Sequence, residues 1–388
     1  MKDVGIYVHI PFCKQKCYYC DFNSYANKNN LKAEYIKNLL TEIQQVGQSN
    51  KNDYEQNRDD LVLVKTIYIG GGTPSILNSK AIIQIIKTIK NNFTVSDDAE
   101  ITIEVNPGTV TEEKLKDYFN CGINRLSIGL QETDDKLLKS IGRIHTYQDF
   151  TTTYEIARKI GFKNINIDLI IGLPNQNIKN IENSIKKIIE HKPEHISVYS
   201  LIVEDGTKLK EMIQNKTLNE IEDEYEREMY WYVNKELIKH GYNHYEISNY
   251  AKPGFESKHN TDCWNQKEYI GFGAGAHSYT NFTRFSNVDS IEEYINNYKN
   301  NEESKNFVFH ERQNLESAMK EFMMLGLRKI DGIAISDFKN KFIQNPIYIY
   351  KDELYKLVKE DLIEIDENVI KLSKKGIDLA NLVWEEFV

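Results

Sequence analysis

The sequence predicts an α/β protein, a partial (β/α)6 barrel followed by a small α+β domain. Six short runs with the composition of β-strands recur in the first half of the chain, and segments with helix-spaced apolar residues separate them. Such alternation is typical of parallel strands joined by crossover helices. Six units are compatible with an open sheet or with a partial barrel.

The predicted elements follow one another in a regular order. The strand runs are residues 4–10, 66–72, 100–106, 125–131, 164–174 and 195–202. The clearest helical segments are residues 34–43, 80–93 and 181–191, in which apolar residues recur every three to four positions. Residues 46–60 are polar and aperiodic, and we predict that they form a surface loop or insertion.

Alternation within the strands favours the barrel. In the run 100–106 the apolar residues share one face, and the polar residues Thr102, Glu104 and Asn106 share the other. Parallel strands that are covered on both faces are usually apolar throughout. Polar side chains that face inward are costly unless they form hydrogen bonds. We therefore expect a barrel built around a polar ligand.

The barrel pattern ends around residues 286–310. Helical segments follow, and two strand runs then flank Asp366-Glu367-Asn368 before a closing helix. We predict two domains. Residues 1–285 form the partial barrel with a β-extension, and residues 286–388 form a winged-helix-like accessory domain. This second segment has no clear basic stripe, which favours a lid or docking role over DNA binding.

The composition narrows the functional classes. The formal net charge is −9, from 49 Lys and Arg against 58 Asp and Glu, which argues against nonspecific nucleic-acid binding. The start of the sequence has no signal-peptide pattern, and no apolar run is long enough to span a bilayer. We expect a protein of the cytoplasm, where cysteine thiols stay reduced.

Three cysteines form the most informative motif. Cys13, Cys17 and Cys20 have the spacing C-x3-C-x2-C. Three thiolates can hold three irons of a [4Fe-4S] cluster and leave the fourth iron open for a ligand. A structural zinc site usually needs four ligands, and Cys121 and Cys263 are distant single residues. The alternatives are a zinc site, a disulfide and chance clustering, and the spacing favours the cluster.

Polar residues also gather at the predicted strand ends. The glycines of 70–72 end the second strand, Glu104 and Asn106 end the third, Gln131 ends the fourth, and Asp168 lies in the fifth. Ligand sites of parallel α/β folds lie at the carboxyl ends of the strands. These groups converge if the strands are parallel and adjacent.

Several motifs together resemble the radical S-adenosylmethionine (SAM) family, and more narrowly its oxygen-independent coproporphyrinogen III oxidase group. Beside the cysteines, they are GGGTPS at 70–75, IEVNPG at 103–108, RLSIGLQ at 125–131, IDLIIGLP at 167–174, HYEISNYA at 244–251 and LGLR at 325–328. The resemblance implies a [4Fe-4S] cluster on Cys13, Cys17 and Cys20. It also implies SAM on the open iron, where one electron would cleave it to a 5′-deoxyadenosyl radical.

The resemblance further implies a set of cofactor-binding residues. They are Tyr7, Tyr19, Gly71, Gly72, Thr73, Glu104, Gln131, Arg143 and Asp168. The backbone of 71–73 would contact the amino group of SAM, and Glu104, Gln131 and Asp168 its hydroxyl or amine groups. Arg143 would pair with a carboxylate, and the two tyrosines would flank cluster and adenine. The alternatives are purely structural roles, namely a surface ion pair for Arg143 and simple packing for Tyr7 and Tyr19.

Two departures from the decarboxylating oxidase resemble the HemW-type heme chaperones instead. Phe22 stands where the oxidase has a fourth cysteine, and only twelve residues precede Cys13, too few for the oxidase's N-terminal arm. The chaperone motif H-N-x-x-Y-W is matched by residues 259–264, with Cys263 in place of the tyrosine. This implies His259 as a heme ligand and Trp264 as a stacking residue. The alternative is a local hydrogen-bonding turn, and His277 is a second candidate ligand.

The first hypothesis is therefore a heme chaperone that carries heme to respiratory acceptor proteins, for which coproporphyrinogen oxidase activity is not expected. The alternative is a radical enzyme that decarboxylates coproporphyrinogen III, or methylates or opens heme. A third hypothesis is a binding protein whose cluster only gates docking. The expected partners are heme or a related tetrapyrrole, an acceptor protein and a low-potential electron donor, with transient membrane contact and a homodimer as further expectations.

Overall fold

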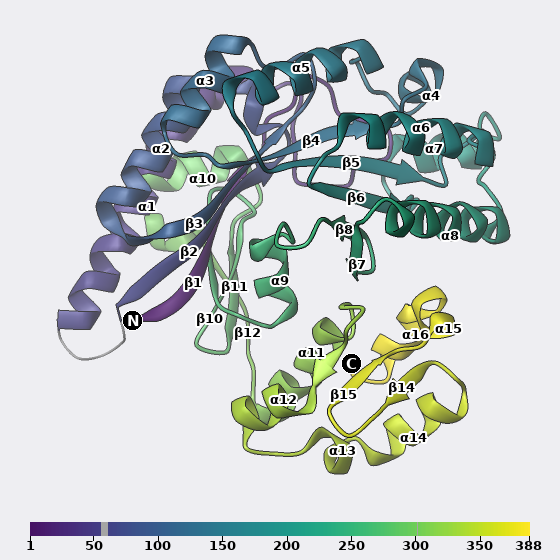
Figure 1. Cartoon of the computed structure of the whole chain (residues 1–388). Coiled ribbons are helices and arrows are strands. Elements are labelled where there is room, and N and C mark those ends of the chain that lie inside the picture. Colours follow the sequence, from purple (N-terminus) through teal and green to yellow (C-terminus); the bar gives the residue numbers. More distant parts are fainter. Residues whose placement is uncertain (56–60, 301) are drawn as a thin grey trace.

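Two β-sheets organise the chain. The computed structural model describes residues 1–55, 61–300 and 302–388 (Figure 1). The larger sheet has the strand order β12-β11-β10-β9-β1-β2-β3-β4-β5-β6-β8-β7, and the smaller has the order β13-β15-β14.

The six predicted strands are confirmed, and they lie side by side and parallel in chain order. They are β1 (Lys2–Ile10), β2 (Val62–Gly71), β3 (Thr94–Val105), β4 (Arg125–Gln131), β5 (Ile165–Ile171) and β6 (His195–Ser200). The barrel stays open because β1 pairs with β9 on its free side and β6 pairs with β8. The prediction of a partial (β/α)6 barrel is therefore confirmed.

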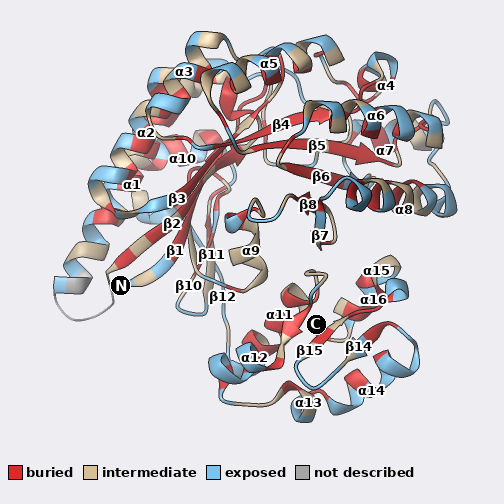
Figure 2. Ribbon diagram, in the orientation of Figure 1, coloured by how far each residue is buried: buried red, intermediate tan, exposed pale blue. Residues whose placement is uncertain are grey.

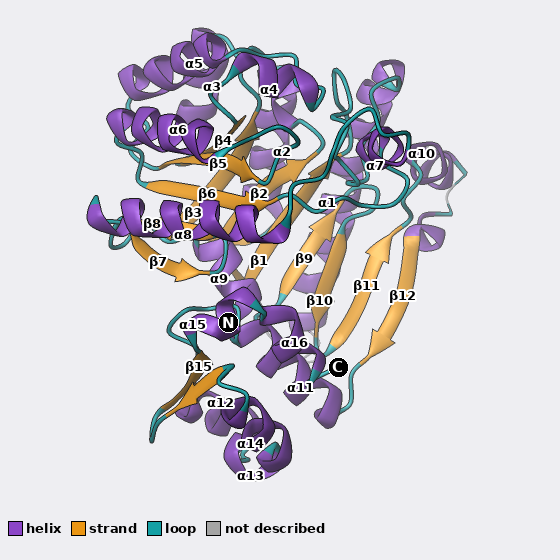
Figure 3. Ribbon diagram, turned by 90° about the vertical axis from the view of Figure 1, so that its right-hand side faces the viewer, coloured by secondary structure: helices purple, strands orange, loops and turns teal. Residues whose placement is uncertain are grey.

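Shorter strands extend the sheet at both edges. On the β1 side, β9 (Tyr269–Phe272) is parallel to β1, and antiparallel strands then continue the sheet, as Figure 3 shows. These are β10 (His277–Thr280), β11 (Thr283–Asn287) and β12 (Phe307–Arg312). On the β6 side lie β8 (Asn249–Ala251) and β7 (Asn243–Glu246), both antiparallel to their neighbours.

Helices cover the outer face of the parallel strands (Figures 1 and 2). The strands contribute a row of buried aliphatic residues to this layer, and each helix buries one apolar stripe against it. In α2, for example, Ile82, Ile85 and Ile89 are fully buried. The helices of this part are α1 (Lys32–Glu55), α2 (Ser79–Asn92), α3 (Glu112–Asn120), α4 (Asp135–Ser140), α5 (Tyr147–Ile160), α6 (Ile178–His191), α7 (Lys208–Gln214), α8 (Asp223–Lys239), α9 (Lys258–Trp264) and α10 (Ile291–Lys299).

The prediction of a loop over 46–60 is wrong for residues 46–55, which continue α1 to Glu55. Residues 56–60 lie outside the described part of the chain. The helix continues because Val46 packs on the core and Gly47 lies against the end of α2, where a Cβ atom would come within 2.6 Å of the Asn92 Cβ. Close contact with a neighbouring helix, rather than an apolar repeat, supports this stretch.

The C-terminal residues form a separate core around a three-stranded sheet, with Phe322, Phe338 and Phe342 in edge-to-face or tilted contact. The predicted strand pair is confirmed, since β14 and β15 pair around the turn at 366–368. The elements are α11 (Leu315–Gly326), β13 (Ile333–Ala334), α12 (Ile335–Phe342), α13 (Pro346–Ile349), α14 (Lys351–Lys359), β14 (Ile363–Ile365), β15 (Val369–Leu372), α15 (Lys374–Asp378) and α16 (Ala380–Glu385).

The division at residues 285 and 286 stays a prediction. Because β11 and β12 belong to the large sheet as far as Arg312, we propose that the C-terminal domain begins after that residue. None of the helices in the described ranges is long and apolar enough to cross a membrane.

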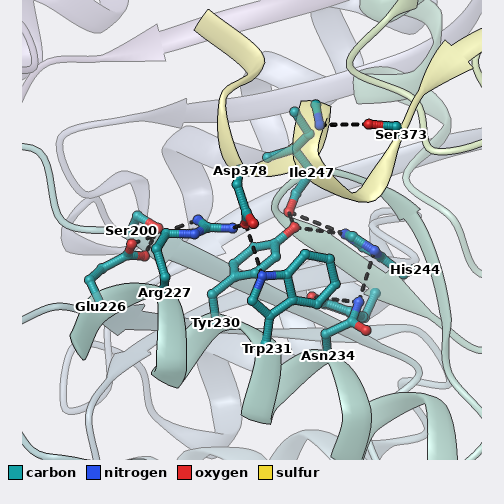
Figure 4. A network of polar contacts seen from close by, with 12 residues as sticks. Ser200, Glu226, Arg227, Tyr230, Trp231, Asn234, His244, Ile247, Ser373 and Asp378 are labelled. Carbon is teal, nitrogen blue, oxygen red and sulfur yellow. Dashed lines mark hydrogen bonds and ion pairs between the residues drawn. The ribbon is translucent and has the colours of Figure 1, made fainter. Parts of the chain in front are cut away.

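A polar junction joins the two domains (Figure 4). On α8, the Trp231 Nε1 group donates to Asp378 Oδ1 at 2.9 Å, and Arg227 forms an ion pair with the same carboxylate of α15. Nearby, the Tyr230 hydroxyl donates to the Ile247 carbonyl at 2.9 Å. The junction fixes the C-terminal domain beside α8, β7 and β8.

Candidate functional site

The three cysteines of the motif line one cavity of about 450 Å³ in the loop that follows β1. Cys13 is buried, and Cys17 and Cys20 are half-buried. Burial raises the pKa of the Cys13 and Cys20 thiols. Binding of a metal group would have to offset this effect, because the thiolate is the form that ligates.

Backbone contacts hold this loop against several elements. The Cys13 amide donates to the Tyr25 carbonyl at 3.0 Å, which closes the loop on itself. The Tyr18 amide donates to the Ile141 carbonyl at 3.0 Å, and the Leu209 amide donates to the Tyr18 carbonyl at 2.7 Å. The ends of α4 and α7 therefore anchor the middle of the loop.

A glycine makes room for the first cysteine. A Cβ atom on Gly72 would lie 2.9 Å from Cys13 Sγ and 2.9 Å from the Phe12 carbonyl oxygen. No other residue type allows this approach without a shift of the loop. The end of β2 is thus shaped around the cysteine.

The arrangement of the thiols suits a group larger than one ion. Among the residues that the structure describes, no three side chains of His, Cys, Asp or Glu converge in a way that could hold a single metal ion. The three thiols nevertheless share one cavity wall. A multi-iron cluster takes its cysteines from around its periphery, so the donor set fits such a cluster better than a zinc ion.

Two half-buried acids lie in the same cavity. Glu104 accepts hydrogen bonds from the Tyr68 hydroxyl at 3.0 Å and from the Gly71 amide at 3.1 Å. Burial, and then the charge of Asp168, raises the pKa of Glu104 to about 8. Burial also raises the pKa of Asp168, although Asn166 Nδ2 donates to it at 2.7 Å. A positive charge on a ligand would favour the ionised form of both acids, and ligand hydroxyl groups could donate hydrogen bonds to them. The pair of acids therefore suits a ligand that carries positive charge and hydroxyl groups.

The predicted residues of β2 and β4 also line the cavity, namely Gly71, Gly72, Thr73 and Gln131. Gly71 has a φ of +117°, and a Cβ atom there would lie 2.7 Å from the His9 ring. The turn at the end of β2 therefore requires glycine at this position.

Arg143 and Tyr19 belong to the cavity wall as well. Arg143 is not a surface ion pair: its Nη1 group donates to Cys17 Sγ at 3.6 Å, and its Nη2 group donates to Asn106 Oδ1 at 2.9 Å. The same Nη2 group donates to the Gly129 carbonyl at 2.6 Å. Burial is the main cause that raises the pKa of the Tyr19 hydroxyl.

Tyr7 lies outside the set of cavity-lining residues. Its hydroxyl contacts His9 Nδ1 at 2.9 Å, and its ring stacks on Tyr68 with centroids 6.3 Å apart. These contacts are those of a packed side chain, and a role of Tyr7 beside cluster and adenine stays a prediction.

His259 belongs to α9, is buried, and lies outside the set of cavity-lining residues. Its ring stacks on Tyr68 with centroids 5.3 Å apart, and its Nδ1 is 2.8 Å from the Thr66 hydroxyl. Burial, and then the charge of Arg125, lowers the pKa of His259 to about 4. Thr66 precedes the end of β2 by five residues, so this histidine contacts the strand well below the cysteine loop.

Trp264 lies at the domain junction. The guanidinium carbon of Arg328 is 4.5 Å from the centre of the Trp264 ring and 4.7 Å from that of Trp384. Burial raises the pKa of the neighbouring Cys263 to about 12. His277 is exposed and stacks on His310 with centroids 5.1 Å apart. The structure therefore brings together the residues predicted to bind the cluster and SAM, except Tyr7, and leaves His259 and Trp264 outside the cavity lining.

Strand parity places Asn106 and Ser127 on polar faces predicted to line the interior, and both residues line the cavity. No cavity role is predicted from the sequence for four other lining residues, Phe22, Tyr68, Tyr199 and Ile202. Tyr68 carries a parity signal, since it shares a face with Gly70 and Gly72. Phe22 and Ile202 are 63% and 67% exposed at the mouth, and only the fold brings them there.

Comparisons with known proteins agree with this geometry. Residues 7–188 match the radical SAM superfamily and residues 313–379 match the HemN C-terminal domain. The chain is 38% identical over 386 residues to the heme chaperone HemW of Bacillus subtilis, covering 98% of both chains. It is 35% identical to HemW of Lactococcus lactis, covering 100% of this chain and 98% of that protein.

A solved structure shares the fold. The coproporphyrinogen III oxidase HemN from Escherichia coli superposes with a TM-score of 0.85, covering 100% of this chain and 90% of that one, at 23% identity. At 23% identity, the superposition shows a shared architecture only. The chemistry of this chain depends on the residues of its own cavity.

Proposed function

Because this chain belongs to the HemW heme chaperone family of radical SAM proteins, we propose that it binds heme and delivers it to acceptor proteins. The observation that carries the proposal is the cavity that combines Cys13, Cys17 and Cys20 with the acids Glu104 and Asp168. It supports a protein that retains the radical SAM machinery. Phe22, exposed at the mouth in place of a fourth cysteine, favours the chaperone over the oxidase.

We propose that the three cysteines hold a [4Fe-4S] cluster and that the rest of the cavity holds SAM. When bound and reduced, the cluster supplies the electron for cleavage of SAM. The backbone at 71–73 would orient the amino group of SAM, and Glu104, Gln131 and Asp168 its hydroxyl and amine groups. The half-buried position of the thiols limits the access of water to the metal group.

For heme, the proposed contacts remain His259 and Trp264. Ligation by His259 would use Nε2, because Nδ1 contacts the Thr66 hydroxyl, and it requires the buried ring to become accessible to heme. Stacking of a porphyrin on Trp264 requires displacement of Arg328. Heme binding at these residues therefore implies a rearrangement of α9 against the barrel and the C-terminal domain.

The proposed setting is the cytoplasm, with respiratory proteins as acceptors, a low-potential electron donor, transient membrane contact and a homodimer as further parts of the proposal.

A second function has one observation in its favour. The cavity keeps three cysteines, two acids and the glycines at the end of β2, which a radical enzyme acting on a tetrapyrrole would also use, although Phe22 replaces the fourth cysteine of the oxidase.

One assay separates the two functions. The protein is reconstituted anaerobically with iron and sulfide, and then incubated with SAM, a low-potential reductant and coproporphyrinogen III. The tetrapyrrole mass is read by mass spectrometry, and heme binding is followed in parallel by its Soret absorption. We expect about four irons per chain, an unchanged tetrapyrrole and bound heme. Loss of two carboxyl groups from the tetrapyrrole would overturn the chaperone proposal.

The control for this assay replaces all three cysteines by serine. We expect that variant to take up no cluster and to leave SAM intact. Release of 5′-deoxyadenosine by the unaltered chain, with the tetrapyrrole unchanged, would show that SAM is cleaved without decarboxylation.

A further inference from the structure

Each cysteine sulfur of the motif has a different side chain within hydrogen-bonding distance. The Thr73 hydroxyl donates to Cys13 Sγ at 3.6 Å, and Arg143 Nη1 donates to Cys17 Sγ at 3.6 Å. The Ser24 hydroxyl lies 3.9 Å from Cys20 Sγ. The sulfurs therefore differ in environment, because one faces a cationic donor and two face neutral hydroxyls.

Asn106 connects two of these donors. Its Oδ1 accepts from Arg143 Nη2 at 2.9 Å, and its Nδ2 donates to Thr73 Oγ1 at 2.9 Å. A threonine hydroxyl has one proton to donate. Since Thr73 accepts from the amide, its own proton is free for Cys13. The result is a continuous chain of hydrogen bonds from Cys17 through Arg143, Asn106 and Thr73 to Cys13.

The surrounding structure holds this chain in place. The backbone amide of Asn106 donates to the Ser75 hydroxyl at 3.1 Å, and this contact holds Asn106 directly after the end of β3. Gly129 of β4 leaves the room that the contact needs, because a Cβ atom there would lie 2.9 Å from Asn106 Oδ1 and 3.2 Å from Arg143 Nη2. Thr73 is only 4% exposed. Burial strengthens such contacts because water cannot compete for the donors.

We propose that Asn106 is a positioning residue for the cluster, which aims the hydrogen-bond donors of Arg143 and Thr73 at two ligand sulfurs and thereby raises its reduction potential. The inference rests on the proposed cluster at the three cysteines. Reduction adds one electron from a low-potential donor and moves no proton. Donors on a thiolate stabilise the more electron-rich reduced state, so their loss makes reduction harder. A charged donor such as Arg143 has the larger effect.

The test uses the full chain and a matched pair of variants. Thr73→Val keeps the shape of the side chain but removes the hydroxyl, and Thr73→Ser keeps the hydroxyl. Asn106→Leu removes both contacts of the connecting amide. Each protein is reconstituted anaerobically without SAM. Iron and sulfide are counted, and the cluster is titrated with Ti(III) citrate while its reduced form is followed by electron paramagnetic resonance.

We expect iron and sulfide contents equal to those of the unaltered chain in all variants that fold. At the potential where half of the unaltered cluster is reduced, the ratio of reduced to oxidised cluster should fall about threefold in Thr73→Val and further in Asn106→Leu. Thr73→Ser should restore the unaltered ratio. If Asn106→Leu does not fold, the difference in reduction between Thr73→Val and Thr73→Ser tests the proposal by itself.

Two results overturn the inference in different ways. Equal potentials in all variants, with full clusters, overturn the positioning role of Asn106 and leave the proposed function intact. An unaltered chain that takes up no iron–sulfur cluster under these conditions overturns the proposed function and the inference together.

Discussion

Tyr68 and His259 stack with their ring centroids 5.3 Å apart, and of the two Tyr68 lines the cysteine-containing cavity while His259 belongs to α9. The Tyr68 hydroxyl donates to Glu104 on the cavity side. One tyrosine of β2 thus touches both the proposed SAM site and the proposed heme ligand. Movement of His259 toward heme would release one face of Tyr68, so the two sites are joined by a single side chain.

Replacement of His259 by alanine should weaken heme binding by at least about tenfold, if the imidazole is the iron ligand. The measurement is a Soret titration of the purified protein. Thr66→Val is the control, because it removes the hydrogen-bonding partner of the ring but keeps the imidazole. Iron and sulfide content should stay unchanged in both variants. An unaltered Soret titration in His259→Ala would exclude the ligand role.

The pKa of Glu104, raised to about 8, predicts a pH dependence of stability in the ligand-free protein. The folded state holds the proton more tightly than the unfolded state, so this group favours folding at low pH. Its contribution is fully present below the ordinary pKa of 4.5 and is lost as pH rises toward about 8.

Glu104→Gln cannot lose a proton, so its melting temperature should exceed that of the unaltered chain by a margin that grows between pH 5 and pH 8. Thermal unfolding followed by circular dichroism at several pH values measures this margin. A difference that stays constant across the range would contradict the prediction. Addition of SAM should stabilise the unaltered chain more than the variant if Glu104 contacts SAM as proposed.

Substitution Gly72→Ala should prevent normal cluster assembly. The added Cβ atom meets Cys13 Sγ and the Phe12 carbonyl at 2.9 Å, and relief of such overlap costs about 1–3 kcal/mol of folding free energy. Iron content after reconstitution and chemical unfolding are the readouts. Gly206→Ala is the control for destabilisation alone, since its φ of +76° makes alanine strained there but an added Cβ atom has no atom within 4 Å, so iron uptake should persist. Equal iron content in both variants would remove the role assigned to Gly72.

The domain junction should depend on one carboxylate. Asp378→Ala removes the acceptor of Trp231 Nε1 and the ion-pair partner of Arg227 together (Figure 4). We expect a loss of about 1–3 kcal/mol in unfolding free energy and faster proteolysis between the domains. Asp378→Asn keeps an acceptor for the indole and should lose less. Identical protease resistance of the three proteins would show that other contacts hold the domains.

The strand runs could be predicted because their signal is local. In β3, alternation places Glu104 and Asn106 on the face opposite Ile103, and the structure places both polar residues in the cavity. The extension of α1 could not be predicted, since it depends on the contact of Gly47 with Asn92 of another helix. A polar stretch has no periodicity from which to infer such a contact.

For the candidate site, motif spacing identified the cysteines, and strand parity identified Glu104 and Asp168. Neither could show that Arg143 donates to Cys17, because 126 residues separate the two in the chain. Likewise, the run 259–264 gave no indication that His259 packs on Tyr68 or that Trp264 packs on Arg328. These partners come from other segments of the chain.

By itself, the sequence determined the alternation of strands and helices, the inward polar face and the three thiols on one short loop. These features follow from covalent spacing and from the two-residue and 3.6-residue periods of the backbone. The tertiary structure alone decided which donors face the sulfurs and that His259 packs against Tyr68. Such contacts depend on how distant segments pack, and packing is set by the shape and burial of the whole core.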